Sequence, residues 1–183
     1  FAHEAVAWFG NSLYETEDRG DACFYRFTPE REPKEAGDLA SFGGKLDALV
    51  VRGRPNFDAD AAQPGESYQV EWVTVDEPNP LTDTVLYQAQ ARGAAIFNRT
   101  EGIWATDKGL YFDCTSGGDA GLGQLWELRP KGRDGGTLKL IFESENAEDL
   151  EAPDNLVVVP DTGDVFLQED GPAGDGQYIR GLT

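Results

Sequence analysis

Short runs of alternating apolar and polar residues recur along the chain, each followed by a turn rich in Gly, Asp or Asn. One such run covers residues 3–8, and a second short apolar segment follows its turn at residues 13–14. The same succession of run, turn and second segment returns from residue 100 and again from residue 153. Alternation with a period of two is typical of half-buried β-strands, and self-similarity along a chain indicates a repeat architecture. The pattern therefore predicts three copies of a β-meander.

The match between the first two copies extends to two further strands. Residues 24–29 correspond to residues 125–130, and residues 43–49 correspond to residues 135–141. Four short strands joined by tight turns form the meander of a propeller blade. We therefore expect an all-β fold, a partial β-propeller with about three four-stranded blades.

This pattern divides the chain into three blades and one insertion. The first blade is expected over residues 1–52, the insertion over 53–98, the second blade over 99–145 and an incomplete third blade over 150–183. Within the insertion we expect a strand near residues 68–75 and one amphipathic helix within residues 81–97. Three blades do not close a ring, so the remaining blades of the same protein are expected as partners. The chain starts with Phe and contains no Met, which leads us to expect a piece of a longer protein.

Charge and composition exclude several classes of partner. The 183 residues include 15 Lys and Arg against 34 Asp and Glu, for a formal net charge of −19. Such a chain has no basic face for nucleic acid or for anionic lipid. No apolar run is long enough for a membrane span. Its two cysteines, Cys23 and Cys114, lie outside any zinc-binding spacing, and a disulfide between them is left open.

Three acidic residues occupy the same place in the three copies of the repeat. They are Glu4, Glu101 and Asp154, each at the start of the first strand of its unit. In a propeller the first strands surround the central channel, so rotation about the axis would bring the three carboxylates together. Converging carboxylates repel one another and need a cation, for which oxygen ligands suit calcium or another hard ion. The sequence therefore predicts a metal site at the axis, with ordinary turn residues as the alternative.

Arg99 and His3 stand beside these acids. Arg99 precedes Glu101 by two residues and suits bidentate binding of a phosphate or carboxylate, or a salt bridge to a nearby acid. His3 is the single histidine and adjoins Glu4, where it would act as a general acid, a metal ligand or a partner of a ligand.

Two further acidic pairs follow the second strand of the first and third units. They are residues 17–18 and the pair Glu169 and Asp170. Such residues hold loops through turn hydrogen bonds, form hydrogen bonds to metal ligands, or bind calcium themselves. We favour the loop-holding role.

Several motifs resemble the PhoX-type alkaline phosphatase family. They are FAHEAV at residues 1–6, FNRTEG at 97–102 followed by Trp104, YFDCTSGG at 111–118, and PDN at 153–155. The resemblance implies a six-bladed propeller that is exported by a twin-arginine signal, and hence is periplasmic or secreted. It also implies hydrolysis of phosphate monoesters by a cluster of calcium and ferric iron.

The resemblance also assigns roles to individual residues. It implies that Glu4 and Glu101 bind metal and that Arg99 binds phosphate, with Asp154 as a further ligand. The family's iron-binding Cys belongs to a motif that would precede residue 1, and neither Cys23 nor Cys114 matches that motif. We therefore expect an incomplete metal cluster in this segment.

Two other functions remain open beside a phosphatase. The first is a calcium-dependent lactonase of the gluconolactonase type, because residues 101–104 and 153–155 are also similar to that family's axial ligands. The second is a non-catalytic propeller module stabilised by calcium. Turnover of a phosphate ester or of a lactone, or of neither, distinguishes the three.

Overall fold

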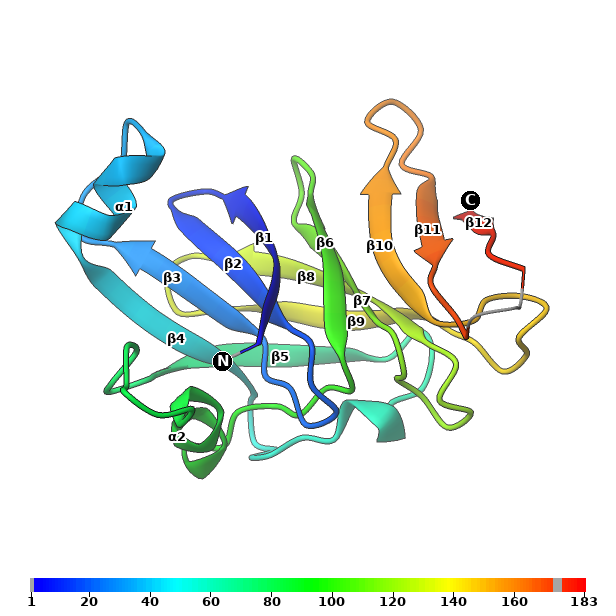
Figure 1. The fold of residues 1–183 in the computed structure, drawn as a ribbon, viewed down its shortest axis with the longest axis horizontal. Coiled ribbons are helices and arrows are strands. Elements are labelled where there is room, and N and C mark those ends of the chain that lie inside the picture. The colour runs from blue at the N-terminus through cyan, green and yellow to red at the C-terminus, as the bar shows by residue number, and fades with distance from the viewer. Residues whose placement is uncertain (1, 173–175) are drawn as a thin grey trace.

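The computed structural model describes residues 2–172 and 176–183, so Phe1 and residues 173–175 of the predicted third blade lie outside the described residues. Nearly all of the regular structure is β-strand (Figure 1). The first meander consists of β1 (His3–Phe9), β2 (Ser12–Glu17), β3 (Tyr25–Pro29) and β4 (Gly44–Val51). The second consists of β6 (Thr100–Ala105), β7 (Leu110–Cys114), β8 (Gln124–Lys131) and β9 (Gly135–Glu143). The predicted all-β class and both four-stranded meanders are confirmed.

A strand from the insertion joins the two meanders. β5 (Ser67–Thr74) pairs antiparallel with β4 on one side and with β9 on the other, which makes a nine-stranded sheet in the order β1-β2-β3-β4-β5-β9-β8-β7-β6. This sheet curls so that β1 and β6, at its two ends, lie side by side (Figure 1). The strand near residues 68–75 was predicted, but its pairing partners were not. The division into blades at residues 1–52, 99–145 and 150–183 stays a prediction, since β5 makes one sheet of the first two units.

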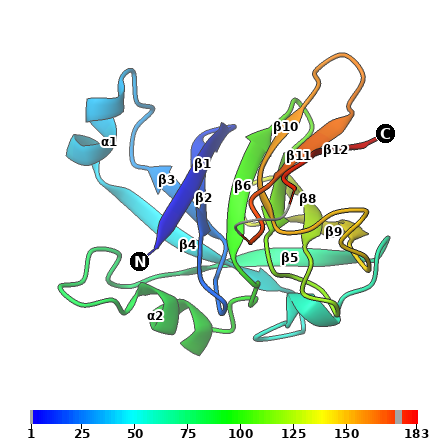
Figure 2. The same cartoon turned by 45° about the vertical axis from the view of Figure 1, so that its right-hand side comes forward.

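A separate three-stranded sheet follows. It consists of β10 (Pro153–Val158), β11 (Val165–Glu169) and β12 (Ile179–Leu182), and β10 packs beside β6 (Figure 2). The first strands of the three predicted copies, β1, β6 and β10, therefore stand next to one another. We call them the inner strands.

Apolar side chains between the sheets hold the inner strands in place. Between the two meanders, Phe24 stacks on Phe112 with ring centroids 4.5 Å apart, and Trp126 is fully buried beside them. Leu125 and Leu156 belong to a second cluster, between the second meander and the three-stranded sheet. Burial of large aromatic and aliphatic side chains is the main stabilising contribution in such packing.

The helices are short and lie outside the sheets. α2 (Val85–Ala91) falls within the predicted helix and packs its apolar side chains on the outer face of the first meander. α1 (Ala36–Phe42) was not predicted, because it buries no side chain and so has no amphipathic pattern. A one-turn 3₁₀ helix, Ala59–Ala61, precedes β5. In the part of the chain that the structure describes, no helix is long and apolar enough to cross a membrane.

Candidate functional site at the inner strands

Each inner strand carries an irregularity at its acidic residue. The pairing register shifts between His3 and Val6 in β1, between Thr100 and Ile103 in β6, and between Pro153 and Asn155 in β10. Glu4, Glu101 and Asp154 all fall within these shifts. A β-bulge adds one residue to a strand and redirects a side chain, and bulges are frequent beside active sites. The repeated acids therefore share a backbone geometry as well as a place in the sequence.

Side chains from the second strand of each meander hold the first two bulges. The amide of Ala5 donates to Thr16 Oγ1 at 2.9 Å, and the corresponding amide of Gly102 donates to Asp113 Oδ1, also at 2.9 Å. Gly102 is needed for close approach, since a Cβ there would lie 2.7 Å from the Cα of Asn155 on β10. The bulge of β6 is thus fixed between β7 and β10.

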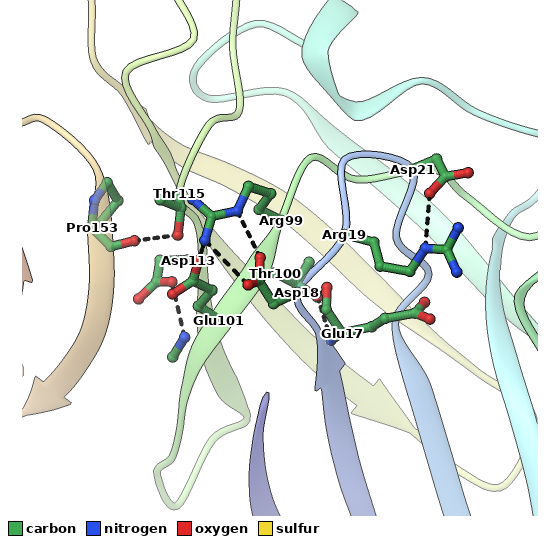
Figure 3. A network of polar contacts seen from close by, with 11 residues as sticks. Glu17, Asp18, Arg19, Asp21, Arg99, Thr100, Glu101, Asp113, Thr115 and Pro153 are labelled. Atoms are coloured by element: carbon green, nitrogen blue, oxygen red, sulfur yellow. Dashed lines mark hydrogen bonds and ion pairs between the residues drawn. The ribbon is translucent and has the colours of Figure 1, made fainter. Parts of the chain in front are cut away.

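The structure brings Glu101 and Asp154 together. Glu101 is 4% exposed, and its carboxyl group lies beside that of Asp154 and near the hydroxyl of Thr115. Burial, followed by the hydrogen bond with Asp154, raises the pKa of Glu101 to about 8. Thr115 also donates to the carbonyl of Pro153 at 2.6 Å, which ties β10 to the loop after β7. Figure 3 shows Glu101, Asp113, Thr115 and Pro153 of this region, with Arg99 beside them.

Glu4 and His3 are placed differently. Glu4 is exposed on β1 and makes no hydrogen bond or ion pair with another residue of the described ranges. The neighbouring His3 side chain pairs with Glu15, with Nδ1 3.0 Å from Oε2. The bulge in β1 therefore places Glu4 on a neighbouring inner strand without joining it to Glu101 and Asp154. The sequence did not predict the contact between His3 and Glu15.

Arg99 lies directly before β6 and faces two acids. Its side chain forms ion pairs with Asp18 and with Glu101, so the predicted neighbourhood of Arg99 and Glu101 is observed. Arg99 is not part of β6, so the two side chains do not meet as alternate residues of one strand. Arg99 has φ of 59°, in the left-handed region, and this turn of the backbone directs its side chain back toward Glu101.

The acidic pairs after the second strands hold loops. Glu17 is fully buried, and its Oε2 accepts hydrogen bonds from the Cys23 amide at 3.1 Å and the Tyr25 hydroxyl at 3.0 Å. Glu169 accepts from Arg180 Nε at 2.7 Å and from two backbone amides. Asp170 is exposed, and its amide donates to the Ala152 carbonyl at 2.9 Å. These contacts support the loop-holding interpretation.

The donor atoms at the inner strands suit a hard cation in type. Glu101 and Asp154 offer carboxylate oxygens, and the fully buried Asp113 beside them has one oxygen, Oδ2, without a hydrogen-bond partner in the described residues. Burial raises the pKa of Asp113 well above its ordinary value, and a buried carboxyl group is neutralised by a proton or paired with a cation. Within residues 2–172 and 176–183, however, no three His, Cys, Asp or Glu side chains are grouped as a metal-ligand set. The donors of this segment therefore fit calcium or ferric iron in chemistry but make only part of a site.

Neither cysteine adds to this set. Cys23 and Cys114 are both free and buried, so they form no disulfide with each other. Burial raises the pKa of Cys23 to about 12 and that of Cys114 well above its ordinary value. Because metals bind the thiolate, these thiols are structural.

A pH-dependent contribution to stability is expected from Glu15. Burial raises the pKa of Glu15 from 4.5 to about 7, and partial burial lowers the pKa of its neighbour His3, which is therefore neutral when Glu15 ionises. Because the pKa of Glu15 is higher in the folded than in the unfolded protein, the stabilisation of the fold by Glu15 is complete below pH 4.5 and is lost as the pH rises through about 7. The free energy of unfolding that is lost in this way is on the order of 3 kcal/mol.

Glu15→Gln should therefore stabilise the full-length protein at pH 8.5 relative to wild type and have little effect at low pH. Urea unfolding midpoints of both proteins between pH 5 and 8.5 measure this difference. The exposed Glu71, which pairs with Arg52, offers the control substitution Glu71→Gln. A difference between Glu15→Gln and wild type that does not change with pH would contradict the assignment.

Comparison with known proteins gives one family and one similar structure. A family model described as alkaline phosphatase PhoX matches residues 1–183. The fold is similar to that of Pseudomonas fluorescens PhoX in complex with vanadate, a transition state analogue, with a TM-score of 0.66 and 15% sequence identity. The similarity covers 98% of this chain and 42% of that one, so this chain spans less than half the length of that structure. No curated protein sequence matches the chain significantly.

Proposed function

This chain belongs to the PhoX family of alkaline phosphatases, and on that premise we propose that it is a segment of a metal-dependent phosphomonoesterase. The observation that carries the proposal is the position of Arg99. Its guanidinium forms an ion pair with the buried carboxylate of Glu101, beside which lies the half-buried carboxyl group of Asp154, at the ends of the inner strands. A cation-binding pair of carboxylates beside a fixed arginine is the arrangement that phosphoryl transfer requires.

Arg99 has donors to spare for a phosphoryl group. Its Nε and Nη2 are occupied by Asp18 and Glu101, whereas Nη1 makes no hydrogen bond to the described residues. The N–H groups of Nη1 are thus available to donate to a phosphoryl oxygen, in a charge-assisted hydrogen bond of the kind that arginine favours. The side chain is 39% exposed, so a substrate can reach it from solvent.

Glu101, Asp154 and Glu4 would hold the cations, with further ligands from the rest of the protein. Calcium is the hard cation that their oxygens suit, and ferric iron is implied by the family alone. When bound, such cations offset the negative charge that develops on the phosphoryl oxygens. The role of this chain's own residues is to position the carboxylates that would hold the cations. The bulges direct these carboxylates, Asp113 holds the amide of Gly102 next to Glu101, and Thr115 ties β10 to the loop after β7.

The same family membership is the basis for inferring the location, substrate and partners of the protein. We infer export to the periplasm or the extracellular space, a phosphate monoester as substrate, and packing of the remaining propeller blades of the same protein against this segment. His3, Glu169 and Asp170 support the site through the loops and strand that carry them rather than by touching substrate.

Assays of the full-length protein test the proposed function. Loaded with calcium and iron, it is expected to hydrolyse p-nitrophenyl phosphate, and chelation is expected to lower the rate by about 10³-fold, corresponding to several kcal/mol of charge stabilisation. Restoring the cations should restore the rate, and heat-treated protein is the control. Turnover of a lactone in place of the phosphate ester would assign the lactonase function, and bound calcium without turnover of either would assign a binding module; both results would overturn the proposal.

A further inference from the structure

The loop between β2 and β3 fixes the backbone of Arg99. The Arg99 amide donates to the carbonyl of Arg19 at 2.8 Å, and the Arg99 carbonyl accepts from the Thr115 amide at 2.9 Å. These two bonds hold the residue in its left-handed conformation, in which a side chain other than Gly is strained. Strain of this kind persists only where the surroundings impose it and is frequent at functional sites.

The same loop also holds the Arg99 side chain. Asp18 takes two parallel hydrogen bonds from the guanidinium, from Nε to Oδ1 at 2.6 Å and from Nη2 to Oδ2 at 3.2 Å. The remaining hydrogen of Nη2 is directed to Glu101. A two-point contact fixes the plane of a guanidinium, whereas a single contact leaves it free to rotate. Asp18 is therefore the residue that determines where Nη1 points.

Asp18 is itself firmly placed. Its amide donates to the Ala2 carbonyl at 3.0 Å, and the next residue, Arg19, pairs through its side chain with Asp21 and with Asp83. The buried Glu17 closes the loop through its bonds to Cys23 and Tyr25. Figure 3 shows the loop, with Glu17, Asp18 and Arg19, beside Arg99 and Glu101. The acid that contacts Arg99 thus comes from a rigid part of the first meander.

We propose that Asp18 is a positioning residue for phosphate binding, which acts by holding Arg99 so that Nη1 faces the substrate. The inference rests on the proposed role of Arg99. The pair is partly exposed, with side-chain exposures of 39% for Arg99 and 34% for Asp18, and ion pairs exposed to this degree contribute little to stability. Without Asp18, the guanidinium keeps a single ion pair among the described residues, the one with Glu101. Its plane would then be free to rotate, and Nη1 would no longer be held toward the substrate.

Phosphate binding by the full-length, metal-loaded protein tests the proposal. Asp18→Asn keeps the size of the side chain but removes its charge and one of its two acceptor oxygens. We expect the dissociation constant for inorganic phosphate, measured by calorimetry, and the KM for p-nitrophenyl phosphate to rise on the order of tenfold to a hundredfold. Metal content and melting temperature should be unchanged. Asp18→Glu, which can form the ion pair again, should recover part of the affinity.

Two further variants show whether the effect of Asp18→Asn on phosphate binding depends on Arg99. Asp76→Asn weakens an exposed ion pair outside this loop, with Arg92, and is expected to bind phosphate as wild type does. In an Arg99→Ala background, Asp18→Asn should cause no further loss of phosphate affinity. An equal loss with and without Arg99, or a loss of bound metal in Asp18→Asn, would overturn the proposal. If the wild-type protein bound no phosphate, the proposed function itself would be overturned. That outcome is distinguishable from a failure of the proposal for Asp18.

Discussion

Glu101→Gln is expected to abolish phosphomonoester hydrolysis by the full-length protein, lowering kcat/KM by about 10³-fold or more. The amide oxygen of glutamine can still contact a hard cation but carries no charge, so the anionic ligand that balances the cation's charge is lost. The fold should tolerate the change. Burial already raises the pKa of Glu101 to about 8, which shows that its surroundings favour the neutral form, and glutamine has the same shape. Steady-state kinetics, metal content and thermal unfolding of the variant measure these effects together.

A second buried glutamate gives the matched control. Glu127 on β8 is 6% exposed and pairs with Arg129. It lies opposite Tyr111, which pairs with Trp104 toward the other end of β6 from Glu101. Glu127→Gln therefore changes a comparable ion pair without touching the site, and activity should remain near that of wild type. If Glu101→Gln kept more than about a tenth of the wild-type kcat/KM, Glu101 would not be a metal ligand.

The parts of the site that the sequence predicted are those that repeat. Glu4, Glu101 and Asp154 lie at the same place in β1, β6 and β10 because each strand carries its bulge there. A repeat in the sequence encodes local backbone geometry, and local geometry is copied from unit to unit. The positions of the inner strands were predictable for this reason.

What surrounds each repeated acid was not predictable, because it depends on neighbouring strands. β6 has β1 on one side and β10 on the other, so Glu101 is buried against Asp154. Of the other inner strands, β1 has only β6 beside it within the described residues, and Glu4 is accordingly exposed. Equivalent positions in a repeat therefore reach different electrostatic environments, and a prediction from symmetry alone treats them as equal.

Long-range contacts were missed for a related reason. Asp18 belongs to an acidic pair that the sequence analysis noted, yet it is 81 residues from Arg99 along the chain, and no local pattern connects the two. Asp113 was missed because its role is to accept from a backbone amide, that of Gly102. The bridging position of β5 likewise depends on pairing with strands on both sides. The spacing between Arg99 and Glu101 was informative, although the left-handed backbone of Arg99 had no signal in the sequence.

Arg99→Ala is expected to lower kcat/KM for a phosphomonoester by about 10²- to 10³-fold, through both a higher KM and a lower kcat, because the donors of Nη1 contact the phosphoryl group before and during the reaction. Arg99→Lys should recover little of this loss, since an ammonium group cannot replace the planar fork held by Asp18.

Arg99→Gly separates the loss of the guanidinium group from the relief of backbone strain. It should lose as much activity as Arg99→Ala yet melt at a higher temperature than that variant, because glycine adopts a φ of 59° without cost. Kinetics and thermal unfolding of the three variants test this directly, and near-normal KM and kcat in Arg99→Ala would show that Arg99 serves only as an ion-pair partner of Asp18 and Glu101.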